Sequence, residues 1–363
     1  MGAHTSADLR QMQSLPLEAK IMMTKRRIRE WYEHWDGQVY VSFSGGKDST
    51  VLKHIVDHTP GVYDVPAVFV NTGLEYPEIQ QFVRAVKAGE YDCFNTDVEI
   101  LRPEMRFDEV IKKYGYPVGT KRIASNIEYG RKAKKRGDTQ KFQEYVHGMR
   151  TSKRDGAAYK FMPVPKKLMP LVDSDILVSN KCCNVMKKKP LHVYSDTTGR
   201  KAIVATMACV SKQRADGWMK TGCNAFESKD PKSKPLSFWT EQDVLRYIKE
   251  NNIPIAPVYG EVTYANEPEQ MRWSEYAPGF AGIGSTEQKA LTTTGCKRTG
   301  CIFCMFGCHL EKEPNRFQRL KETHPRQYAY CIGGGEYGPD WLWRPNSDGL
   351  GLGHVLDAIG VKY

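Results

Sequence analysis

A pair of glycines between a strand pattern and a helix pattern most constrains the fold of this chain. Residues 39–43 are β-branched and aromatic, as in a buried strand, and residues 49–56 follow a helical pattern. Between them the chain reads SGGKD. Two glycines let backbone N–H groups turn inward around an anion, and the helix N-terminus adds its positive dipole. The sequence therefore predicts a phosphate-binding loop from Ser44 to Ser49, without the spacing of a Walker A loop.

The alternation of strand and helix continues along the chain. Residues 67–73 and 97–101 are further strand candidates, each followed by a helical pattern. Amphipathic helices are also expected at 15–35 and at 240–251, the second with Thr240 as its N-cap. We therefore expect an α/β fold, with a Rossmann-like parallel sheet and a helical, Cys-rich C-terminal lobe. In such a sheet the ligand site lies at the carboxyl ends of the strands.

Three motifs resemble the phosphoadenylyl-sulfate (PAPS) and adenylyl-sulfate (APS) reductase family of the PP-loop adenine nucleotide alpha-hydrolase superfamily. The SGGKDS loop is similar to the PP-loop, NTGLEYPE at 71–78 to DTGxExPET, and PLSFWTEQDV at 235–244 to PLxxWTxxDVW. The resemblance runs from about residue 38 to residue 310. Asn71 stands where the family usually has Asp, and Met207 and Ala208 replace an expected arginine.

The resemblance implies that an adenine nucleotide, either ATP or PAPS/APS, binds at this loop. Lys47 and Asp48 would then be catalytic, with Mg²⁺ as an accompanying ion. The implied nucleotide-binding residues are Ser44, Gly45, Gly46, Lys47, Asp48, Ser49, Thr72, Gly73, Glu75 and Arg214.

Ten cysteines in a chain without a secretory pattern favour metal binding or redox chemistry over disulfides. Cys296, Cys301 and Cys304 form a C-x4-C-x2-C spacing, and Cys182 and Cys183 are adjacent. Zinc and a 4Fe–4S cluster each take four ligands. Adjacent cysteines suit a cube better than one tetrahedral ion, because the irons of a cube lie apart. We expect a 4Fe–4S cluster, with zinc as the alternative.

The resemblance allows two ligand sets for this centre. The APS reductases imply Cys182, Cys183, Cys301 and Cys304. Related sulfurtransferases imply Cys296 together with Cys301, Cys304 and one of the tandem pair. Cys308 and Cys331 remain as candidate nucleophiles, the second on a Gly-rich tail, and neither has the family's ECGLH context. Cys93, Cys209 and Cys223 are expected to serve packing.

Residues 121–167 carry most of the chain's positive charge. The segment contains 14 Lys and Arg against 4 Asp and Glu, a net of +10, while the whole chain has a net charge of +11. Such a block is typical of a solvated basic surface, and it also suits an arm that contacts nucleic acid phosphates. The sequence does not decide between these two interpretations.

We expect three parts along the chain: a helical extension at 1–37, the nucleotide-binding domain at 38–259 with its basic insertion at 121–167, and a Cys-rich lobe at 260–363. No stretch approaches the length of a membrane span and no signal-peptide pattern is present, so a cytoplasmic location is expected.

Three functions fit these features. The first is reduction of PAPS or APS with a thioredoxin-like partner. The second is ATP-dependent sulfur transfer to nucleic acid, as in DNA phosphorothioation or tRNA thiolation, with a cysteine desulfurase as sulfur source. The third is a non-catalytic nucleotide-binding redox sensor, which the intact SGGKDS disfavours.

Overall fold

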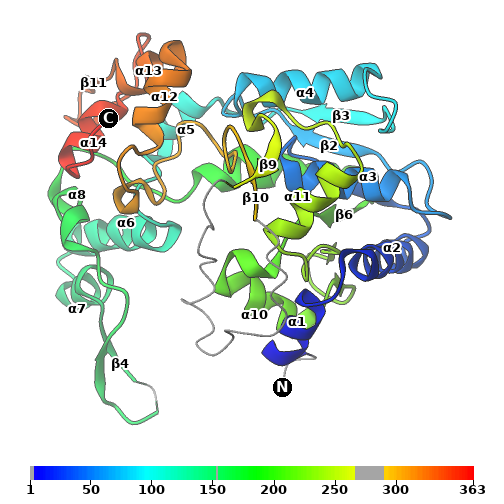
Figure 1. The fold of residues 1–363 in the computed structure, drawn as a ribbon. Coiled ribbons are helices and arrows are strands. Elements are labelled where there is room, and N and C mark those ends of the chain that lie inside the picture. Colours follow the sequence, from blue (N-terminus) through cyan, green and yellow to red (C-terminus); the bar gives the residue numbers. More distant parts are fainter. Residues whose placement is uncertain (1–3, 153, 266–289) are drawn as a thin grey trace. The chain divides into compact units, whose positions relative to one another are not determined.

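The chain groups into two units that alternate along the sequence. The computed structural model describes residues 4–152, 154–265 and 290–363 (Figure 1). Unit 1 comprises Met1–Asn71, Glu75–Leu101 and His192–Thr299, and unit 2 comprises Thr72–Leu74, Arg102–Leu191 and Gly300–Tyr363. These contact-based units cut the chain at positions other than those expected, so the domain boundaries at 37/38 and 259/260 stay predictions. Most of the polar stretch after residue 260 lies outside the described residues.

Unit 1 is built on a six-stranded sheet in the order β3-β2-β1-β6-β8-β7. All neighbouring strands are parallel except β7, which runs antiparallel to β8. The chain runs outward from β1 in both directions, which is the order of a doubly wound sheet. The predicted α/β fold with a mainly parallel sheet is therefore confirmed. The strands are β1 (Val39–Ser42), β2 (Ala67–Val70), β3 (Val98–Leu101), β6 (Lys201–Val204), β7 (Asn224–Ala225) and β8 (Lys232–Ser233).

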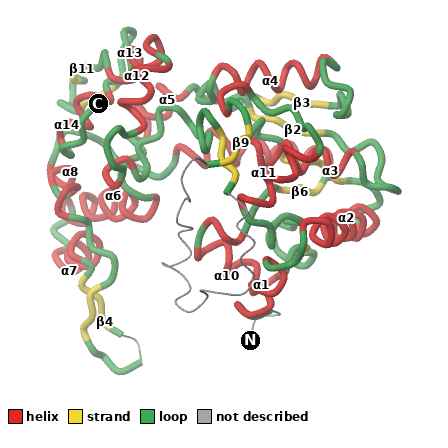
Figure 2. Tube along the Cα trace, viewed as in Figure 1, coloured by secondary structure: helices red, strands yellow, loops and turns green. Residues whose placement is uncertain are grey.

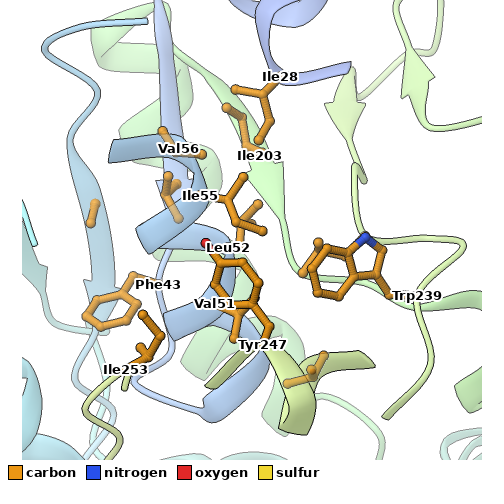
Figure 3. Close-up of a cluster of buried hydrophobic side chains, with 14 of the residues drawn as sticks. Ile28, Phe43, Val51, Leu52, Ile55, Val56, Ile203, Trp239, Tyr247 and Ile253 are labelled. Carbon is orange, nitrogen blue, oxygen red and sulfur yellow. The ribbon is translucent and has the colours of Figure 1, made fainter. Parts of the chain in front are cut away.

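Apolar faces of helices cover this sheet and form its core. Figure 3 shows Ile28, Leu52, Ile55 and Trp239 in this core, and each is fully buried. Their burial removes large apolar surfaces from water and stabilises the sheet beneath the predicted loop. The helices of unit 1 are α1 (Ser6–Gln13), α2 (Leu17–His34), α3 (Lys47–Asp57), α4 (Pro77–Ala88), α10 (Lys212–Thr221) and α11 (Glu241–Glu250), and α9 (Lys189–Thr198) crosses from unit 2 into unit 1.

Two of these helices confirm specific sequence predictions. Helix α2 occupies most of the expected 15–35 range and packs against α3. Its Lys20 Nζ lies 2.6 Å from Asp243 Oδ2 of α11, a buried ion pair that fastens it to the sheet domain. Helix α11 begins after Thr240, whose side chain accepts from the Asp243 N–H in a capping box. A separate hairpin of β9 (Val262–Tyr264) and β10 (Leu291–Thr293) completes unit 1.

Unit 2 is mostly helical, with two short antiparallel hairpins (Figure 2). Its apolar interior includes Ile127, Ile176, Phe317 and Val355, each fully buried. Its elements are α5 (Phe107–Tyr114), α6 (Lys121–Lys135), α7 (Thr139–Phe142), β4 (Met149–Thr151), β5 (Ala158–Lys160), α8 (Pro170–Asp173), α12 (Arg316–Thr323), α13 (Pro325–Ile332), β11 (Glu336–Tyr337), β12 (Trp343–Arg344) and α14 (Leu352–Ala358). Within the part of the chain that the structure describes, no helix has the length and apolar character needed to cross a lipid bilayer.

Candidate functional site

The predicted loop lies between β1 and α3, at the point where the sheet reverses its strand order. Gly45 has a φ of +68°, and a Cβ there would come within 2.8 Å of Ile79 and 2.9 Å of Val83 on α4. Glycine is thus required twice, by the backbone conformation and by the close approach of α4. This packing holds the loop tightly over the end of the sheet.

Hydroxyl groups surround the first turn of α3. Gly46 is the N-cap residue of this helix and offers no side-chain cap. The Gly46 N–H donates to Ser44 Oγ at 3.3 Å, and the Lys47 N–H donates to the Tyr259 hydroxyl at 3.2 Å. Tyr259 is in turn 2.6 Å from Thr299 Oγ1, and Ser44 Oγ is 3.0 Å from Ser49 Oγ. Both amides donate to hydroxyl oxygens, and phosphate oxygens would replace these hydroxyls as acceptors of the amide N–H groups.

Lys47 places a buried ammonium at this turn. Its side chain is only 5% exposed, and its Nζ lies 3.0 Å from Glu241 Oε1 and 3.8 Å from Asp48 Oδ1. The same Nζ donates to the Lys297 carbonyl at 2.9 Å. The oxygens around Lys47 hold its ammonium in place, and an anionic ligand at the loop would compete with Glu241 for it.

Asp48 is the acidic group of the loop. Burial raises the pKa of its carboxyl, while Lys47, Arg298 and Arg214 act in the opposite direction. Its Oδ1 is buried and accepts no hydrogen bond from any described residue. A buried carboxylate oxygen that accepts no hydrogen bond, next to the predicted phosphate-binding loop, suits a cation such as Mg²⁺.

The remaining predicted nucleotide-binding residues fall into both units. Arg214 is exposed in α10, and it acts on the pKa of Asp48 within unit 1. Glu75 is buried just before α4 in unit 1, whereas Thr72 and Gly73 belong to unit 2. The roles of these four residues in nucleotide binding stay predictions.

Sequence reasoning missed three groups that the structure brings to the loop: Tyr259, Thr299 and Glu241. Glu241 directly follows the Thr240 cap in the PLSFWTEQDV motif, so the motif carried a signal for it. Tyr259 lies 212 residues after Lys47 in the sequence, and Thr299 lies farther still. No local sequence pattern marks either residue. Only the tertiary fold brings these hydroxyls to α3.

Four of the five candidate metal ligands lie in unit 2: Cys182, Cys183, Cys301 and Cys304. Two backbone bridges bring their segments together, because Tyr116 pairs with Val178 and Gly119 pairs with Phe306. Burial raises the pKa of Cys182, and the thiols of Cys301, Cys183 and Cys304 act in the same direction. The negative charge of any of these three thiolates would thus disfavour ionisation of Cys182.

Two cations lie in the surroundings of these thiols. Burial raises the pKa of both Cys182 and Cys304, and Lys187 opposes this shift at each thiol. Arg316 donates to the Cys304 carbonyl at 2.7 Å and also lowers the pKa of that thiol. Among the described residues, no three His, Cys, Asp or Glu side chains come together as a site that could hold a metal ion. The case for a metal centre at these cysteines therefore depends on residue type, shared unit and nearby positive charge.

The other candidate cysteines are placed differently. Cys296 belongs to unit 1, where its N–H donates to the Val258 carbonyl. Cys308 is buried in unit 2, and burial raises its pKa to about 12. Cys331 does not lie on a loose Gly-rich tail but within α13, fully buried, where burial raises its pKa. A nucleophilic role for Cys308 or Cys331 stays a prediction, and burial disfavours the thiolate that it would need.

The packing assignment holds for Cys223, which is buried, but not for Cys209. Cys209 is exposed, and its thiol donates to the Trp239 carbonyl at 3.4 Å. Desolvation by the surrounding protein raises the pKa of this thiol to about 11; Arg298 lowers it, whereas Glu241 and Asp48 raise it further. An exposed thiol therefore lies near the charged groups of the loop.

Comparison with known proteins matches most of the chain to one family. The phosphoadenosine phosphosulfate reductase domain family matches residues 38–170 and 163–306. An adenosine 5'-phosphosulfate reductase of Lysinibacillus sphaericus is 33% identical over 87 residues, which cover 23% of this chain and 34% of that protein. An uncharacterized protein of Methanocaldococcus jannaschii is 36% identical over 100 residues, covering 28% of this chain and 20% of that protein.

Among solved structures, a phosphoadenylyl-sulfate reductase from Candida auris in complex with phosphate is similar to this chain. The TM-score is 0.36 and the sequence identity is 15%, with coverage of 70% of this chain and 91% of that chain. The family match spans the phosphate loop, the tandem cysteines and the Cys-x2-Cys pair. This chain belongs to the phosphoadenosine phosphosulfate reductase domain family.

Proposed function

We propose that this protein is an enzyme of sulfur metabolism that binds the phosphate groups of an adenine nucleotide at the Ser44–Ser49 loop. The observation that carries the proposal is the first turn of α3, where the amides of Gly46 and Lys47, the buried Lys47 ammonium and several hydroxyls converge. Donors fixed before the ligand arrives need little reorganisation, which favours both binding and stabilisation of developing charge.

The first candidate reaction is reduction of an adenylyl-sulfate ester, the chemistry of the reductases in this family. A cysteine thiolate attacks the sulfate sulfur, the bond from sulfur to the phosphate oxygen breaks, and the nucleotide leaves with the electron pair. The enzyme then carries an S-sulfonate. One thiolate of an external dithiol, of the thioredoxin-like class, attacks the cysteine sulfur and releases sulfite. The second thiol of that dithiol resolves the mixed disulfide and restores the cysteine.

The second candidate reaction is ATP-dependent transfer of sulfur to nucleic acid. The basic segment 121–167 favours it, because a sulfonucleotide is too small to require a net charge of +10. An acceptor oxygen attacks the α-phosphorus and pyrophosphate leaves. A persulfide sulfur then displaces AMP, and a second thiol cleaves the persulfide bond, so that the two thiols end as a disulfide. Lys47 and the loop amides would stabilise the phosphate charge in either reaction, and Asp48 would hold Mg²⁺ beside it.

We further propose that Cys182, Cys183, Cys301 and Cys304 hold a 4Fe–4S cluster. The support is their common unit and the two backbone bridges that join their segments. Adjacent cysteines also suit a cube better than a single zinc ion. A bound cluster would cross-link these segments and supply one-electron redox chemistry.

Separate incubations with PAPS, APS and ATP test the nucleotide chemistry. Reconstituted protein with a dithiol should release sulfite and a phosphoadenosine or AMP product from one sulfonucleotide. The ATP incubation also contains nucleic acid as acceptor and a persulfide donor. Release of AMP and pyrophosphate there, but no sulfite from either ester, would support sulfur transfer instead. No product from any of the three nucleotides would contradict both reactions and favour the non-catalytic sensor.

A further inference from the structure

An exposed aromatic surface lies on the β11–β12 hairpin of unit 2. The side chains of Trp341 and Tyr337 are 78% and 49% exposed, although both residues are large and usually buried. The centroid of the Tyr337 ring lies 6.3 Å from that of Trp341 and 5.2 Å from that of Trp343. These three rings form a cluster, which we call the aromatic platform.

Hydrogen bonds hold the base of this platform. The Trp343 N–H donates to the Asp175 carbonyl at 3.0 Å, and its indole Nε1 donates to the Gly351 carbonyl at 2.9 Å. The Asp175 carboxylate lies 3.0 Å from His354 Nε2, and the His354 ring packs on Trp343 with centroids 4.4 Å apart. Trp343 is therefore held by hydrogen bonds and ring packing, while Trp341 and Tyr337 remain exposed to solvent.

A basic hollow of about 280 Å³ lies at the C-terminal end of α6. Its lining includes Arg131, Lys134 and Lys135, together with Asp173 and Ser174. The Arg131 guanidinium donates to the carbonyls of Leu171 and Ser174, and Lys134 Nζ lies 2.7 Å from Asp173 Oδ1. These partners partly neutralise the hollow.

One cation of the lining and its neighbour in the chain are not neutralised in this way. Lys135 and Arg136 are exposed, and neither makes an ion pair within the described ranges. The β4–β5 hairpin adds the exposed residues Arg154 and Lys160 to the same unit. The charge of this region therefore remains strongly positive after its internal pairs are counted.

One short segment connects the hollow with the platform. Asp173 and Ser174 line the hollow, while the next residue, Asp175, supports the platform through Trp343 and His354. Ile176 then pairs with Trp343 as an isolated bridge. Consecutive Cα atoms lie about 3.8 Å apart, so the two features adjoin within one unit.

We propose that unit 2 binds single-stranded nucleic acid, with phosphates at the basic hollow and unpaired bases stacked on Trp341 and Tyr337. Exposed aromatic rings beside a positively charged track are the features by which proteins bind single strands. A duplex keeps its base faces stacked internally, so it could use the cations but not the rings. This inference extends the second candidate reaction, the transfer of sulfur to nucleic acid, and rests on that proposed function.

Binding of labelled single-stranded RNA and DNA oligonucleotides tests the proposal without any nucleotide turnover. Replacing Trp341 with alanine should weaken binding roughly 5- to 150-fold, the loss of one base stack. Trp341→Phe should restore most of the affinity, because it retains an aromatic face. Met22→Ala is the matched control: Met22 is 69% exposed on α2 in unit 1, and its loss should change nothing.

The salt dependence tests the phosphate contacts. Replacing Lys135 and Arg136 together with alanine should reduce the slope of log affinity against log salt by about 1.5. Lys229→Ala, an exposed lysine of unit 1, should leave the slope unchanged. Duplex binding as tight as single-strand binding, or an inert Trp341→Ala variant, would overturn the proposal. Binding of PAPS or ATP to that variant without oligonucleotide reports on the nucleotide site alone, so the two proposals can fail separately.

Discussion

The two units build their candidate sites in different ways. The loop of unit 1 is a continuous stretch between one strand and one helix, and its geometry follows from the sheet. The cysteine site of unit 2 joins segments near 119, 180 and 303 through two isolated bridges rather than through a sheet. The comparison teaches that the backbone of the predicted phosphate loop can form from one strand–helix connection, whereas the four thiols depend on distant segments meeting. A bound cluster would therefore stabilise the structure of unit 2 more than a bound nucleotide would stabilise that of unit 1.

The largest expected effect comes from removing one cluster ligand. Protein with the cluster should be brown, with broad absorbance at about 400 nm. Cys304→Ser should abolish this absorbance, because it removes one of the four proposed ligands. Cys223→Ser, at a buried cysteine of unit 1, should retain it. A colourless wild-type protein with one equivalent of zinc would show that the iron–sulfur assignment is wrong.

A substitution in the loop tests how tightly unit 1 is built. Gly45→Ala should lower the free energy of unfolding by about 2–4 kcal/mol, since it adds both left-handed strain and a clash with α4. Gly61→Ala separates the two causes. Gly61 has a φ of +82° but its Cβ would meet only Arg29 at 3.9 Å, so about 1–2 kcal/mol is expected there. If urea denaturation gave equal losses of unfolding free energy for Gly45→Ala and Gly61→Ala, close packing of α4 against the loop would be contradicted.

Removal of the Lys47 charge should have the next largest effect, on turnover. Lys47→Ala should lower turnover by at least 10- to 150-fold, because a charge-assisted contact of about 1.5–3 kcal/mol is lost at the reacting phosphate. Steady-state kinetics with the nucleotide that supports turnover measure this loss. Lys229→Ala again serves as the control. Full activity of Lys47→Ala would remove the loop from the mechanism.

The smallest expected effect concerns acid stability in the core of unit 1. Burial, aided by the charges of His58, Lys25 and Lys53, lowers the pKa of His54 from 6.5 to about 4. The unfolded chain therefore takes up a proton as the pH falls through 6.5, while the folded chain does so only near 4. The contribution of His54 to the free energy of unfolding is therefore fully present above pH 6.5 and is lost as the pH falls toward 4. The loss is about 2 kcal/mol after allowance for partial exposure of the ring.

His54→Gln should remove this pH dependence. Glutamine does not titrate and can still bond to the Tyr247 hydroxyl, which lies 2.8 Å from His54 Nδ1. The free energy of unfolding between pH 7 and pH 4.5 should then fall less than in the wild type, whereas the exposed His34→Gln should behave as the wild type does. Identical pH profiles for both variants would assign the acid sensitivity to other groups.

The sequence predicted the first three strands of the sheet in unit 1, together with α2, α3, α4 and α11, because their signals are local. The glycines at 45–46, the Thr240 cap and the alternation of strands and helices depend on neighbouring residues, and each agrees with the structure. The position of Tyr259 against Lys47, the exposure of Cys209 and the burial of Cys331 depend on contacts between distant segments. Composition and spacing carry no information on such contacts, so these features could not be foreseen.

The hydrogen bond from Lys47 to the Lys297 carbonyl has a mechanical consequence. Residue 297 lies two residues before Thr299, where unit 1 ends, and the cysteine pair begins at 301. An anion that drew the Lys47 ammonium toward itself would deprive the Lys297 carbonyl of this donor. Occupancy of the predicted loop would thereby change how the last residues of unit 1 are held.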